Sequence, residues 1–137
     1  MTEKTRPTLR RLAASLLYEF LVIFSLLMVG FWIPQTILTG AGVAMHGRLM
    51  ILHIFALLMV YFVWFWLNGG QTLPMRTWRL RVISADGYRL RPAQALLRYL
   101  AAWPSVISLV GILWVFVDRD RRFLHDRIAG TRIVAID

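Results

Sequence analysis

Long apolar runs separated by short polar stretches dominate the pattern of hydrophobic and polar positions. The first run covers residues 12–33 and contains one formal charge, Glu19, near its middle. The second covers residues 49–67 and contains none. About 20 apolar residues cross the roughly 30 Å hydrocarbon core of a bilayer. The pattern therefore predicts two membrane-spanning helices, the first of which ends before Pro34.

A third apolar run covers residues 93–117, with one charge, Arg98, and with Pro104 at its centre. Its length would allow a crossing. A single crossing, however, would separate the arginines of residues 68–92 from those of residues 118–137, against the preference of basic loops for the cytoplasm. We favour a re-entrant or strongly kinked pair of half-helices, while a single kinked span with the C-terminus outside stays open.

The polar segment 68–92 carries shorter patterns. Thr72 stands where it could cap a short helix. Apolar residues alternate with arginines over residues 78–82, and Asp86-Gly87 is a turn signal, so residues 78–91 predict a β-hairpin. The β-branched run at residues 131–136 predicts a third strand if it lies on the same side.

The expected fold is an all-α membrane protein. It has two spanning helices, a third Pro-kinked or re-entrant helical segment, a small cytoplasmic β-hairpin and a third strand from the C-terminus. We expect one domain over residues 1–137.

Composition agrees with a membrane protein. The chain is 58% hydrophobic and has a net charge of +9 and no cysteine, with a mean hydropathy of +0.61. In a soluble chain this charge would suggest nucleic acid, but the apolar runs favour the anionic lipids of the cytoplasmic leaflet, at about 1 kcal/mol per basic residue. Four basic residues within residues 1–11 place the N-terminus in the cytoplasm. Disulfides and thiolate metal sites are excluded.

Glu19 is the main candidate functional residue. A charged side chain at the centre of a spanning helix costs roughly 2.5–3.5 kcal/mol on insertion scales, so Glu19 needs a partner, a proton or a wet cavity. Arg11 lies on the same helix about 12 Å away along its axis, which makes Arg98 the better partner. His53 is interpreted as a neutral side chain hydrogen-bonded to a neighbouring helix, with proton movement as the alternative.

No catalytic or metal-binding motif is present. The histidines lack metal-ligand spacing, and there is no phosphate-binding loop, nucleophile elbow or dinucleotide fingerprint. The pair His125-Asp126 is interpreted as a loop cap. An enzyme acting through this pair would need a nucleophile or metal constellation that the sequence lacks, so we expect no enzyme and no cofactor.

Four stretches in the same order resemble the RDD family of bacterial membrane proteins, which is named for one arginine and two aspartates. RRLAASLLYE (10–19) resembles the opening of the family pattern, and GGQTLPMRTWRLRV (69–82) its central segment. LLRYLAAWPS (96–105) and FVDRDRRFLHDRIAGTRIV (116–134) resemble the entry to the last apolar segment and the closing motif.

The resemblance assigns candidate motif residues. Arg11 or Arg10 takes the arginine position, and Glu19 stands at the first aspartate position with one extra methylene. Asp126 is the choice for the final aspartate, with Asp118 as the alternative. The matched turn residues are Gly69, Gly70, Gln71, Thr72, Gly130 and Thr131, and Pro74 stands where a glycine is usual.

The family resemblance implies a multi-pass protein of the bacterial inner membrane without a defined activity. Because two or three helices enclose no pathway alone, we expect a structural or accessory subunit, acting as a homo-oligomer or within a larger membrane complex. The alternative is a cation/proton antiporter or transporter component that uses Glu19, as has been proposed for a few relatives.

Overall fold

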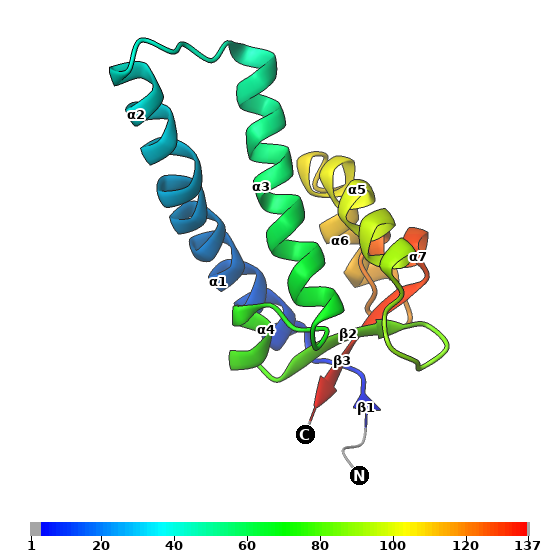
Figure 1. Ribbon diagram of the computed structural model, residues 1–137. Coiled ribbons are helices and arrows are strands. Elements are labelled where there is room, and N and C mark those ends of the chain that lie inside the picture. Colours follow the sequence, from blue (N-terminus) through cyan, green and yellow to red (C-terminus); the bar gives the residue numbers. More distant parts are fainter. Residues whose placement is uncertain (1–3, 137) are drawn as a thin grey trace.

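A computed structural model describes residues 4–136 of the chain. Residues 1–3 of the predicted cytoplasmic N-terminus and residue 137 of the tail lie outside the described residues. Figure 1 shows two long helices side by side, a group of shorter helices packed next to them, and a small sheet at one end.

The sequence predicted that the first long helix ends before Pro34, and this is wrong. Helix α1 (Leu9–Leu27) continues through a π-helical turn, η1 (Met28–Trp32), into α2 (Ile33–Gly40). The amide of Ile33 donates to the carbonyl of Met28, five residues earlier. This wider turn comes directly before Pro34, which has no amide hydrogen to donate, so the chain stays helical past the proline.

Helix α3 (Gly47–Leu67) runs antiparallel to α1 and α2 and begins two residues earlier than expected. Both Leu9–Gly40 and Gly47–Leu67 are long and apolar enough to cross a membrane. The two helices approach each other closely at Gly30, where a side-chain Cβ would lie 2.8 Å from Cδ2 of Leu57. Glycine at this position therefore leaves room for the side chain of Leu57 between the two spans.

The third apolar run forms helix α5 (Pro92–Ile107) and helix α6 (Val110–Val117), whose axes are bent by 95°. The expected break is present, but not at Pro104, which lies inside α5. The chain turns instead at Leu109, which has a left-handed backbone with φ of 62°. Gly111 is needed after this turn, because a Cβ there would overlap the hydroxyl of Ser105.

The sheet joins three distant parts of the chain in the order β1-β3-β2, with both pairs antiparallel. Its strands are β1 (Lys4–Thr5), β2 (Leu80–Ser84) and β3 (Thr131–Ile136). The predicted C-terminal strand is thus present at the centre of the sheet. Since β1 and β3 pair, both ends of the described chain lie at the same end of the molecule as residues 68–92 (Figure 1).

The predicted hairpin over residues 78–91 is wrong. The turn after β2 forms, with the amide of Ser84 donating to the carbonyl of Tyr88 over 3.0 Å, but no second strand follows. The edge of β2 that faces away from β3 is occupied by the chain at Gly70, because the amide of Val82 donates to the Gly70 carbonyl over 2.7 Å. Short helices complete the fold: α4 (Leu73–Thr77) before β2 and α7 (Leu124–Ala129) before β3.

Helix α5 packs against α3 through aromatic side chains, with Tyr99 at the centre. The Tyr99 hydroxyl donates to the carbonyl of Phe55 over 2.6 Å. Further ring contacts join Phe55, Phe62, Trp66, Tyr99 and Trp103. Helix α3 therefore lies between the α1–α2 helix and the α5–α7 group.

Candidate functional site

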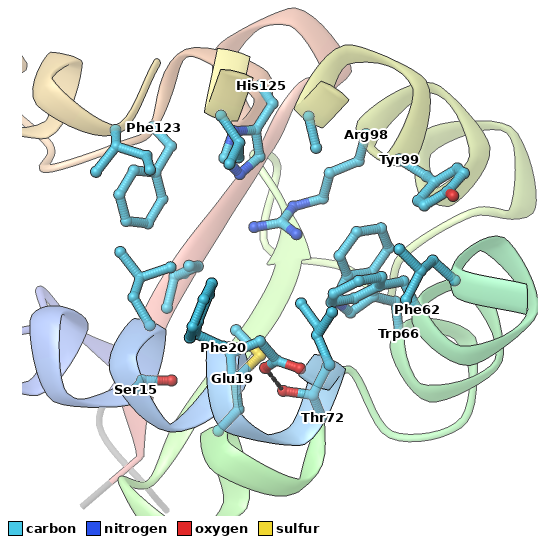
Figure 2. Close-up of a pocket in the computed structure, with 18 of the residues that line it drawn as sticks. Ser15, Glu19, Phe20, Phe62, Trp66, Thr72, Arg98, Tyr99, Phe123 and His125 are labelled. Atoms are coloured by element: carbon cyan, nitrogen blue, oxygen red, sulfur yellow. Dashed lines mark hydrogen bonds between the residues drawn. The ribbon is translucent and has the colours of Figure 1, made fainter. Parts of the chain in front are cut away.

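A cavity of about 340 Å³ lies near the sheet, with lining residues from α1, α3, α4, α5, α6, α7 and strands β2 and β3. Figure 2 shows its apolar walls and the polar side chains among them. The polar side chains in its lining include Ser15, Glu19, Thr72, Arg98 and His125. The cavity thus brings together charged groups from separate helices in an apolar setting.

Glu19 is held by two hydroxyl groups. Tyr61 on α3 donates to Oε1 over 2.9 Å, and Thr72 donates to Oε2 over 2.5 Å. Thr72 immediately precedes α4, but its hydroxyl forms no cap on that helix and is fully buried against the carboxylate. The expected cap is therefore wrong, and the side chain joins α1 to the start of α4 instead.

Arg98 lines the same cavity. The sequence predicted an ion pair with Glu19, but Arg98 pairs with Asp126 instead. Its Nε and Nη2 atoms each lie 2.8 Å from Oδ1 of Asp126, and only 4% of the arginine is exposed. The guanidinium carbon also lies 4.4 Å from the centre of the Trp66 ring, a cation–π contact. Figure 2 shows the guanidinium pointing into the cavity from α5.

Asp126 is the most completely enclosed charge among the described residues, with an exposed fraction of 0%. Besides Arg98, it accepts hydrogen bonds from the amide of Phe123 over 3.2 Å and from the hydroxyl of Thr131 over 3.2 Å. These contacts fix the first turn of α7 and the start of β3 relative to α5. The capping interpretation therefore holds for Asp126, at the start of a helix and not in a loop.

His125 is buried beside Asp126 on α7. Its ring stacks on Phe123, with centroids 5.3 Å apart and an interplanar angle of 4°. Its Nδ1 lies 3.2 Å from the hydroxyl of Ser105 on α5. Burial lowers the pKa of His125 to about 4, although the carboxylate of Asp126 acts in the opposite direction. The ring is consequently neutral at physiological pH.

The other acidic candidate, Asp118, lies outside the cavity. Its two carboxylate oxygens accept bonds of 2.5 and 3.1 Å from Arg127, and the backbone amides of Asp120 and Arg122 also donate to it. The bonded Arg127 holds the pKa of Asp118 below its ordinary value. Asp118 therefore closes the turn between α6 and α7.

The remaining candidates lie away from the cavity. Arg10 and Arg11 lie in the first turn of helix α1, where the amide of Arg11 donates to the hydroxyl of Thr8 over 3.3 Å. At the far end of the two spans, the Nδ1 atom of His53 lies 3.2 Å from the side-chain nitrogen of Gln35 on α2. This matches the interpretation of His53 as a histidine bonded to a neighbouring helix.

The turn residues of the central and closing segments have structural contacts. Gly70 has φ of 71°, and a Cβ there would lie 2.5 Å from the carbonyl oxygen of Val82. The side chain of Gln71 donates to the carbonyl of Leu80 over 2.7 Å. Gly130 ends α7 with φ of 68°, and Gly69 has φ of 112°. Within residues 4–136, no three side chains of the types His, Cys, Asp and Glu come together as a metal site.

Sequence reasoning missed several contact residues of these sites. Tyr61, Gln35, Ser105 and Trp66 were not predicted as partners of the candidate residues. One usable signal was present: a buried charge within an apolar span requires a donor, and Tyr61 carries the one hydroxyl group of α3.

The fold and the cavity define the class as a helical membrane protein with two candidate spanning helices and a small antiparallel sheet. The profile of the RDD family matches residues 5–130, nearly the whole chain, and the chain therefore belongs to this family. The family resemblance drawn from the sequence is thus confirmed.

A curated relative is the uncharacterized protein RP437 of Rickettsia prowazekii (strain Madrid E). It is 28% identical over 74 residues, which cover 54% of this chain and 42% of the relative. The matched part of the chain thus spans less than half of that protein's length. No solved structure matches this chain.

Proposed function

We propose that this chain is a structural or accessory subunit of a membrane assembly, formed with further copies of itself or with other proteins. The observation that carries the proposal is the way in which the polar groups of the helices are used. Glu19, His53, Arg98 and His125 each contact a polar side chain from another part of the fold. Such contacts hold helices in register.

The apolar surface left outside these contacts is the proposed assembly surface. On α1, Leu17, Phe20 and Phe24 are 69%, 68% and 58% exposed, and their spacing of three and four residues places them on one face. Lipid alone could cover this face. A partner helix that packs there would gain van der Waals contacts with large, rigid side chains.

Site-specific photo-crosslinking in intact cells tests this proposal. A benzophenone amino acid in place of Phe20 should give a product of defined higher mass, whereas the same group in place of Tyr88, 74% exposed in the turn after β2, should not. Crosslinks only to lipid at Phe20, together with a monomer in mild detergent, would contradict the proposal. Mass spectrometry of the product distinguishes a second copy from another protein.

The proposed orientation places the sheet and both ends of the chain in the cytoplasm of a bacterium, below the inner membrane. All basic residues except Arg48 and Arg98 belong to residues 1–11, 68–92 and 118–137, and these segments gather around one sheet. The positive-inside rule supports this orientation, with α5 and α6 as a re-entrant pair. A reporter that is active only in the cytoplasm should work when it is fused after Asp137. Activity of a periplasmic reporter at the same position would exclude this orientation.

A second candidate function is cation/proton transport that uses Glu19. It is favoured by one observation, a carboxylate that lines the cavity together with Arg98 and His125. In vesicles, Glu19→Gln should then abolish ion-driven proton flux, while Asp120→Asn on the surface should not. Unchanged flux in Glu19→Gln would remove this candidate, and lost assembly with intact flux would favour the structural role.

A further inference from the structure

A second cavity, of about 390 Å³, lies at the sheet end of α3 on the other side of Trp66. Two features of its lining stand out. Arg81 from β2 and Arg89 from the following turn are both present, and no acidic residue lines this cavity. Neither arginine has a carboxylate partner among the described residues. The cavity therefore presents uncompensated positive charge.

Unused hydrogen-bond donors line the same space. The Nε atom of Arg81 is buried without a partner, which is costly for a charged group. The backbone amides of Gly69 and Gly70 also lack a protein acceptor within residues 4–136. Gly70 cannot be replaced without moving β2, as its Cβ would meet the Val82 carbonyl. The glycine pair thus keeps backbone donors at the edge of the cavity.

The position of the cavity indicates where its ligand comes from. Trp66 and Leu67 line it and are the last two residues of α3, a helix long enough to cross a membrane. The cavity therefore lies at the level where this candidate span ends. Leu90 and Ile83 add apolar side chains to the lining that contains the two arginines. An apolar wall beside paired arginines suits a ligand with a phosphate group and an aliphatic part.

We propose that this cavity is a phosphate-binding site in which Arg81 and Arg89 hold the phosphate group of an anionic phospholipid at the membrane surface. The planar fork of a guanidinium group matches two oxygens of a phosphate, and two such forks can hold one tetrahedral anion. The amides of Gly69 and Gly70 supply further donors. A free phosphate ion has the same chemistry, so the test must separate the two sources.

Calorimetric titration of the purified full chain in phosphate-free detergent solution provides the test. The probes are short-chain phosphatidylglycerol, inorganic phosphate, and a short-chain diacylglycerol without phosphate. Phosphatidylglycerol should bind, and Arg81→Gln and Arg89→Gln should each weaken binding by at least about ten-fold, equivalent to 1.4 kcal/mol. The matched control Arg119→Gln removes the same charge from an exposed position outside the cavity and should change binding less than about two-fold.

Each result bears on the proposal. Inorganic phosphate that binds as tightly as the lipid, with the same dependence on both arginines, supports the phosphate site and assigns its ligand to solution. Binding of the lipid alone assigns it to the membrane. Diacylglycerol that binds equally well, or a control variant that weakens binding as much as Arg81→Gln, overturns the proposal. Arg89 lies in an exposed turn, so its variant tests the site even if Arg81→Gln fails to fold.

Discussion

Two carboxylates lie near the same cavity, and the fold uses them in opposite ways. Asp126 is fully buried, pairs with a guanidinium group and accepts two further hydrogen bonds. Glu19 is only partly buried, lines the cavity and is held by two neutral hydroxyl groups. Asp126 has the contacts of a structural ion pair, whereas the side chain of Glu19 borders the cavity.

This contrast indicates which of the two acidic residues can be changed without loss of the fold. A buried charge that loses its partner leaves the other charge unpaired, which is strongly destabilising. A carboxylate that is bonded to hydroxyl groups leaves only neutral groups behind when it is removed. Tests of transport or assembly are therefore informative at Glu19, while changes at Asp126 report mainly on folding.

The largest effect should follow Asp126→Ala. It leaves Arg98 buried without its counter-charge and should lower the free energy of unfolding by about 3–5 kcal/mol. Thermal unfolding in mild detergent measures this loss. Asp126→Asn keeps the size of the side chain and should be milder, because the amide oxygen can still accept from Phe123 or Thr131. A melting temperature of Asp126→Ala equal to that of the unchanged chain would show that the pair does not hold α5 to α7.

The next largest effect should be the pH dependence due to His125. Because burial lowers its pKa to about 4 from an ordinary value of about 6.5, the unfolded state binds more protons between these values. The contribution of the neutral His125 to the free energy of unfolding should be fully present above pH 6.5. It should fall as the pH drops toward 4, by roughly 1.4 kcal/mol per pH unit at most.

The check for His125 is the difference in melting temperature between the unchanged chain and His125→Gln. That difference should vary with pH between 6.5 and 4 and level off below. Asp118, whose pKa is lowered by Arg127, loses its contribution only as the pH falls below its ordinary value of about 3.9, outside this range. A difference that stays constant from pH 7 to 4 would mean that His125 charges freely in the folded protein.

A smaller loss should follow Thr72→Val, which tests the Glu19 side of the comparison. The change removes one donor to the carboxylate at nearly constant side-chain volume and should cost about 1–3 kcal/mol. Thr72→Ser retains the hydroxyl and serves as the matched control in the same unfolding experiment. A Thr72→Val variant that is as stable as the unchanged chain would show that the bond to Glu19 contributes nothing to stability.

The sequence predicted the local features of this fold better than its contacts. The apolar runs predicted both long helices, and the β-branched run at residues 131–136 predicted a strand, because each depends only on neighbouring residues. The partner of Arg98 could not be read in this way, since 28 residues separate it from Asp126. Tyr61 and Thr72 lie 42 and 53 residues from Glu19, and charge alone favoured an arginine over two hydroxyl groups.

The predicted hairpin failed for a related reason. The turn signal at Asp86-Gly87 is local and correct, but the partner of β2 was decided by distant residues of β3 and by the chain at Gly70. Likewise, the helix continues past Pro34 because a π-turn precedes it, and the sequence gives no simple signal for such a turn.

The smallest effect should come from the far end of the two spans, where Gln35→Leu removes the contact with His53. Gln35 is 6% exposed, and its side-chain nitrogen lies 3.2 Å from Nδ1 of the histidine. The loss should be about 0.5–1.5 kcal/mol, the usual net contribution of a single hydrogen bond outside an ion pair. Gln35→Asn, which keeps the amide group that donates to the ring nitrogen, is the control. If Gln35→Leu instead destabilised the protein as much as Asp126→Ala, the polar contacts near the sheet would not be the main link between the helices. The bond between Gln35 and His53 would then hold the helices together as strongly as the buried ion pair.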